Sequence, residues 1–160
     1  MKKLLLLPLL LISKLAFSQA DTSIIKLSNP PSVSTPKGYS QVAIINLGNS
    51  KMLILSGQVA FDKNGVLVSK DDLAKQTDQV FLNIKSIVES AGGTMDNVVK
   101  LGYFLRDVSQ VQAVRQVRDK YVNLKNPPAS TLVEVSKLFR DDVLIETEAT
   151  AVIPVKSAKR

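Results

Sequence analysis

The chain has 160 residues and contains neither cysteine nor histidine. The absence of cysteine excludes disulfide bonds and a thiol nucleophile. The absence of histidine removes the commonest general base near neutral pH and the commonest ligand of transition metals. A Ser-His-Asp triad, a Cys-His pair and the usual kind of zinc site are therefore excluded, and we expect neither a metal nor a cofactor. Any catalysis has to use carboxylates, hydroxyls, lysine, arginine, tyrosine or backbone groups that hold a water.

The first residues have the pattern of an export signal. Lys2 and Lys3 precede an apolar run over 4–12, whereas a membrane-spanning helix needs roughly 20 apolar residues. Small residues at positions 16 and 18 are typical of a cleavage site. We predict a signal peptide over residues 1–18, cleaved after Ser18 or, alternatively, after Ala20. The mature protein would be periplasmic or secreted, with no membrane association after cleavage. An uncleaved membrane anchor is the competing interpretation.

Much of the positive charge belongs to this leader. The formal net charge is +7, and removing residues 1–18 takes away three lysines and no acid, which leaves +4 (18 basic minus 14 acidic residues). A charge of +4 favours solubility and does not indicate a nucleic-acid partner. The length allows one core. We divide the mature chain into a lead-in over 19–37, a domain over 38–154 and a flexible tail over 155–160.

The hydrophobic pattern predicts strands over 24–27, 41–47, 52–59, 98–106, 131–137 and 143–153 and helices over about 70–91 and 109–124. The first helix carries a stripe of residues three and four apart, which should be buried: Leu73, Thr77, Val80, Phe81, Ile84, Ile87, Val88 and Ala91. Ser69 and Asp72 resemble a capping box at its start, and Gly92 should end it. The second helix should face inward through Val111, Val114, Val117, Tyr121 and Leu124.

This order of elements indicates an α+β fold with both helices on one face of the sheet. The other sheet face would then be bare. Because an exposed apolar sheet face usually has a partner, we expect a homo-oligomer.

Six short segments, in order, are similar to the reactive intermediate deaminase (Rid/YjgF) family. They are Gly38-Tyr39-Ser40-Gln41, Leu55-Ser56-Gly57-Gln58, the helix segment over 83–92, one central strand that matches at Val99-Lys100 and Phe104-Leu105-Arg106-Asp107, Val133-Glu134-Val135, and Ile145-Glu146-Thr147-Glu148-Ala149. The resemblance covers residues 38–153. It implies a chorismate-mutase-like fold, with a mixed sheet of about six strands and two helices on one face, in a homotrimer that holds small molecules in clefts between subunits.

Deaminases of this family hydrolyse 2-imino or enamine acids to 2-oxo acids and ammonia. By resemblance, Tyr39 and Gly57 would line the cleft, and Glu146 would orient the attacking water. Glu146 and Glu148 are two residues apart on one strand and should point to the same face.

Three cleft positions differ from the family pattern. Ser130 stands where the family has an arginine that grips the substrate carboxylate, Leu132 replaces a cysteine, and Arg115 replaces an asparagine that is often found on the second helix. Serine has no charge, and losing a charge-assisted pair of hydrogen bonds should cost about 3 kcal/mol. Arg115 is a candidate to supply the missing charge.

We therefore expect a trimer that binds a small metabolite rather than an efficient imino-acid deaminase. The alternative is an imine or enamine hydrolase of the 2-iminobutanoate/2-iminopropanoate type. A third hypothesis is an extracellular interaction protein that uses the trimer surface. Arg115, Arg118, Lys120 and Lys125 form a small basic patch, but the aromatic residue among them, Tyr121, belongs to the predicted inward face of the helix, so the patch lacks the exposed aromatic residues that RNA binding favours.

Overall fold

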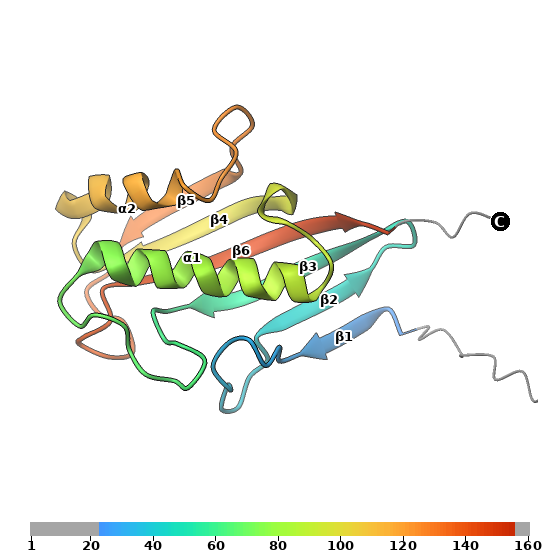
Figure 1. Ribbon diagram of the computed structural model, residues 1–160, viewed down its shortest axis with the longest axis horizontal. Coiled ribbons are helices and arrows are strands. Elements are labelled where there is room, and N and C mark those ends of the chain that lie inside the picture. The colour runs from blue at the N-terminus through green and yellow to red at the C-terminus, as the bar shows by residue number, and fades with distance from the viewer. Residues whose placement is uncertain (1–22, 156–160) are drawn as a thin grey trace, which may run out of the picture.

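The structure is a computed structural model that describes residues 23–155, and it has one mixed sheet covered by helices on one face (Figure 1). The strands are β1 (Ile25–Ser28), β2 (Val42–Asn46), β3 (Ser50–Gln58), β4 (Val98–Leu105), β5 (Ala129–Glu134) and β6 (Ile145–Pro154). The helices are α1 (Leu73–Ser90) and α2 (Val111–Arg118). This confirms the predicted fold class. The predicted signal peptide lies outside the described residues, as does the tail beyond residue 155.

The strand order is β1-β2-β3-β6-β4-β5, and every neighbouring pair is antiparallel except β4 and β5. The parallel pair requires a crossover, which α2 provides. The strand that comes last in the chain, β6, therefore lies near the middle of the sheet, between β3 and β4 (Figure 1). The edge strand β5 has a single neighbour, β4, among the described strands.

The stripe on α1 is buried against the sheet, as predicted, with Phe81, Ile84, Ile87 and Val88 fully inaccessible. The predicted capping box is wrong. Ser69 has φ of 50° and lies before the helix, while the Asp72 side chain accepts a hydrogen bond from the Lys75 backbone N–H at 3.0 Å. The chain leaves the helix at Gly92, whose φ of +82° suits glycine.

The second helix is shorter than predicted, because it ends at Arg118 and Val111 is its first residue. Val114 and Val117 are buried as expected, but Leu124 is 61% exposed. The chain turns after Arg118, whose carbonyl accepts hydrogen bonds from the N–H groups of Tyr121 and Val122. Tyr121 still faces inward and stacks on Phe81, with 5.1 Å between the ring centroids.

The face of the sheet away from the helices carries exposed apolar residues. Leu53 and Leu55 are buried under the helices, so Ile54 between them points to the opposite face and is 46% exposed. The register places Ala43 opposite Ile54, and Leu27 opposite Ala43, on the same side. The uncovered face that the sequence predicts is therefore present.

Candidate functional site

A cavity of about 800 Å³ lies beside the ends of β3 and β6 and brings Tyr39, Gly57 and Glu146 together. It is the size of a typical small-molecule site. The remaining wall residues come from β3 itself and from the segments before β2, after β3 and before β6: Ser34, Thr35, Lys37, Ser56, Val59, Phe61, Lys63, Asn64, Gly65 and Phe139.

The Glu146 carboxylate fits into this cavity because Gly57 has no side chain. A Cβ atom at position 57 would lie 2.7 Å from Glu146 Cδ, which is closer than real side chains allow. Burial raises the pKa of the partly buried Glu146 carboxyl, and the nearby charge of Glu148 raises it further. A carboxyl with a raised pKa can exchange protons nearer to neutral pH, so Glu146 is the residue here best suited to acid–base work.

Glu148 points to the same sheet face as Glu146, as predicted, but it is exposed and is not part of the cavity wall. It lies over Gly102 of β4, where an added Cβ would come within 2.7 Å of Glu148 Oε1. Each of the two carboxylates therefore lies over a glycine of a neighbouring strand.

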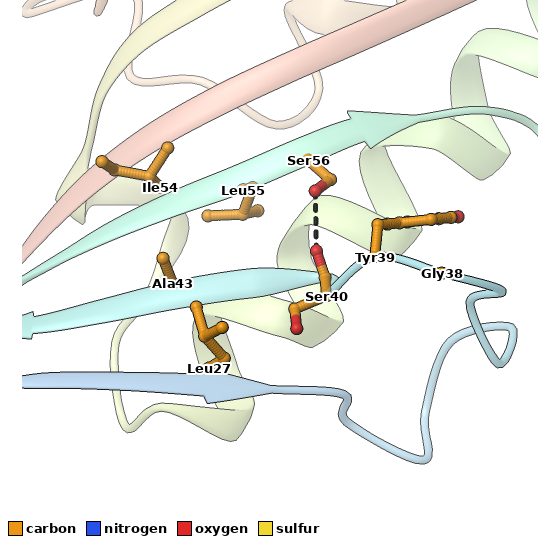
Figure 2. A pocket seen from close by; sticks show the side chains of 8 residues that line it. All are labelled: Leu27, Gly38, Tyr39, Ser40, Ala43, Ile54, Leu55 and Ser56. Atoms are coloured by element: carbon orange, nitrogen blue, oxygen red, sulfur yellow. Dashed lines mark hydrogen bonds between the residues drawn. The ribbon is translucent and has the colours of Figure 1, made fainter.

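Buried glutamines hold the loop that carries Tyr39 against β3. Gln41 donates to the Ser34 carbonyl at 2.8 Å and accepts from the Gln58 amide at 2.8 Å. The Ser56 hydroxyl donates to the Ser40 carbonyl at 2.7 Å, as Figure 2 shows. These bonds fix the backbone on both sides of Tyr39, a residue that is itself 53% exposed.

Tyr39 and Ser56 also line a second, shallower hollow of about 590 Å³ (Figure 2). Its other walls include Leu27, Ala43 and Ile54 of the uncovered sheet face. The main cavity and this apolar face are therefore continuous around Tyr39.

The part of the cavity wall that contains Val59 and Phe61 is anchored by α1. The Asn83 amide donates to the carbonyls of Val59 and Phe61 at 3.1 and 2.9 Å. Phe61 contacts Phe139 edge to face, with 6.0 Å between centroids, and the Arg140 guanidinium lies 5.4 Å from the centroid of the Phe61 ring. The aromatic wall thus joins two loops that are distant in sequence.

Ser130, Leu132 and Arg115 are not part of this cavity. In the register of β5 with β4, Ser130 is opposite Leu101 and Leu132 is opposite Tyr103, so both point to the side of the helices. Ser130 is exposed, Leu132 packs on the edge of the core, and Arg115 is exposed on α2. Tyr39, Gly57 and Glu146 therefore form one group, whereas Ser130 and Leu132 form another on β5, which β4 separates from β6. Arg115 lies apart from the cavity on α2.

Several wall residues were not predicted, namely Lys37, Phe61, Lys63 and Phe139. All four lie in loops, where hydrophobic periodicity gives no signal. A usable signal existed for Asn83, because this polar residue falls on the mostly apolar buried side of the helix, where a polar side chain needs a hydrogen-bond partner.

Over residues 23–155, no group of three acidic side chains could hold a metal ion. Within the same residues, no helix is long and apolar enough to cross a membrane.

Comparison with known proteins agrees with this architecture. The profile of the family described as endoribonuclease L-PSP matches residues 31–153. A RutC family protein of Pyrococcus horikoshii is 38% identical over 128 residues, which is 80% of this chain and 95% of the relative. The chain belongs to the Rid/YjgF family. Another RutC family protein, from Synechocystis, is 31% identical over 132 residues, covering 82% of this chain and 96% of the relative.

Solved structures of Rid/YjgF relatives superpose on nearly their whole length. The YjgF gene product of E. coli has a TM-score of 0.68 and 34% identity, covering 79% of this chain and 98% of its own. The Rid family protein YyfA of Yersinia pestis has a TM-score of 0.71 and 30% identity, with the same coverage. The fold of this chain is therefore the Rid/YjgF fold.

Proposed function

We propose that the chain forms a homotrimer and binds a small metabolite in clefts between its subunits. The observation that carries this proposal is the separation of the site residues into two groups. Tyr39, Gly57 and Glu146 share one cavity, while Ser130 and Leu132 are on the far edge strand. A second copy that places its β5 beside the cavity would complete the site.

The apolar sheet face supports the same assembly. Ile54 and Leu27 are 46% and 65% exposed, and burying each between subunits would contribute roughly 1–2 kcal/mol. Because the cavity and this face meet at Tyr39, association through the face would bring a neighbouring subunit to the cavity.

Imino-acid hydrolysis should be slow in this protein, because β5 has no guanidinium at Ser130. A hydroxyl brings no charge and at most one donor to a carboxylate. We also propose that the protein is exported. Mass analysis of protein recovered from a periplasmic or culture fraction would test this through its first residue, which should be Gln19 or Asp21.

The test of the site is turnover of 2-iminobutanoate, generated in the assay by an amino acid oxidase. We expect wild type to differ little from the spontaneous rate and Ser130→Arg to raise turnover at least about tenfold, since a charge-assisted pair of hydrogen bonds is restored. Ser136→Arg, an exposed position just past β5, is the matched control and should change nothing. A folded, trimeric Ser130→Arg that stays inert would contradict the assigned role of this position.

The second candidate function is imine hydrolysis by the wild-type protein. It is favoured by one observation, the raised pKa of the Glu146 carboxyl beside Gly57 in the cavity. In this case wild-type turnover would exceed the spontaneous rate well beyond error, and Glu146→Gln would abolish it. That pair of results would replace the binding function by catalysis.

A further inference from the structure

We infer that the ligand of this cavity is an aromatic carboxylate, whose acid group is held by Lys37 and Lys63 and whose ring packs against Phe61 and Phe139. This inference rests on the proposed function, because it names the ligand class of the same cleft. In the family pattern the positive charge that holds the acid group is an arginine on β5. Here we assign that role to lysines in two loops that line the cavity.

The two lysines are available for an anion. Both line the cavity, both are exposed, and neither forms an ion pair with another residue between 23 and 155. The Glu146 carboxylate in the same cavity is not paired with either of them among these residues. With two unpaired ammonium groups and one carboxylate, the described wall of the cavity has a net positive charge, which favours an acid group in the ligand.

The backbone around each lysine is fixed in advance. Lys37 belongs to the loop that Gln41 holds through the Ser34 carbonyl. Lys63 lies in a tight turn, where the Asp62 carboxylate accepts hydrogen bonds from the N–H groups of Asn64 and Val66 at 2.9 Å. Fixed loops reduce the ordering cost when an anion binds, so flexible lysine side chains can still give useful affinity.

The aromatic wall explains why the acid should carry a ring. Phe139 is 64% exposed although it is one of the largest apolar side chains of the chain. It meets Phe61 at an interplanar angle of 77°, and Tyr39 lines the same cavity. A ligand ring can add to this edge-to-face arrangement and cover Phe139. A short aliphatic acid of two to four carbons would reach an ammonium group but would leave the phenylalanine rings in water.

The test is isothermal titration calorimetry of the mature chain with phenylpyruvate, 2-oxobutanoate and 3-phenylpropanol. We expect phenylpyruvate to bind at least about tenfold more tightly than 2-oxobutanoate, because phenylpyruvate has an aromatic ring to bury on binding and 2-oxobutanoate has none. The alcohol keeps the ring but lacks the acid group and should bind weakly. The double variant Lys37→Gln, Lys63→Gln should lose roughly tenfold or more in phenylpyruvate affinity.

Two further variants separate the contribution of the ligand ring to the affinity from that of its acid group. Phe139→Ala should weaken phenylpyruvate more than 2-oxobutanoate. Lys85→Gln, on the exposed side of α1 away from the cavity, is the matched lysine control and should bind like wild type.

The outcomes distinguish this inference from the proposed function. If the protein is trimeric and both acids bind equally, or if the double lysine variant binds like wild type, the inference is overturned and the proposed function stands. If no acid binds and the protein is monomeric in sedimentation analysis, both are overturned. Ring preference together with lysine dependence supports the inference.

Discussion

At the scale of single residues, Glu146 should make the stability of the protein depend on pH in an unusual direction. Its pKa is raised by burial and by Glu148 above the ordinary value of 4.5, so the folded state holds the proton more tightly than the unfolded state. The resulting gain in the free energy of unfolding is complete below about pH 4.5 and is lost as the pH rises through the raised pKa.

Urea unfolding of wild type and Glu146→Gln, measured from pH 4 to pH 8, checks this expectation. The free energy of unfolding of the variant should increase relative to that of wild type as the pH rises, because glutamine cannot ionise. Glu148→Gln should shift the wild-type loss to lower pH, since it removes the second cause of the raised pKa. Parallel curves for wild type and Glu146→Gln would show that this carboxyl has an ordinary pKa.

At the scale of elements, α1 is predicted to stabilise the cavity wall through a single side chain. Asn83→Ala would leave the carbonyls of Val59 and Phe61 without their amide donor and should lower the free energy of unfolding by about 1–3 kcal/mol. Gln112→Ala, an exposed position on α2, should cost far less. Urea midpoints of the two variants compare them. Equal midpoints would mean that water replaces the amide at no cost.

The helices and loops also show which parts of the fold could be predicted from the sequence. The stripe of α1 was predictable because burial repeats every three or four residues. The second helix was predicted too long, since Leu124 continues its apolar spacing while the chain has already turned after Arg118. The loops with Lys37 and Phe139 could not be placed, because side-chain to backbone hydrogen bonds from distant residues determine their shape.

The same limit applies to the site. Glu146, Gly57 and Tyr39 could be grouped by resemblance, and the structure brings them together. The distance of Ser130 from this group follows from the strand order, with β5 at the edge, and no local pattern in the sequence encodes that order.

At the scale of the whole molecule, the uncovered sheet face should control assembly. Ile54→Lys places a charge on this face and should convert the proposed trimer to monomers, because an unpaired buried charge costs several kcal/mol. Leu82→Lys is the matched control, since Leu82 is 42% exposed and Ile54 46%, and Leu82 lies on α1, which covers the other face of the sheet. Sedimentation velocity measures both. A trimeric Ile54→Lys would show that the subunits meet elsewhere.

The central position of β6 in the sheet affects when the protein can fold during its synthesis. Because β6 joins β3 to β4, the sheet stays in two unconnected parts until the ribosome has released residues 145–154. The nascent chain therefore cannot complete its sheet before β6 is available. The proposed export would benefit from a late closure of the sheet, because a secretion channel admits a chain that has not yet folded.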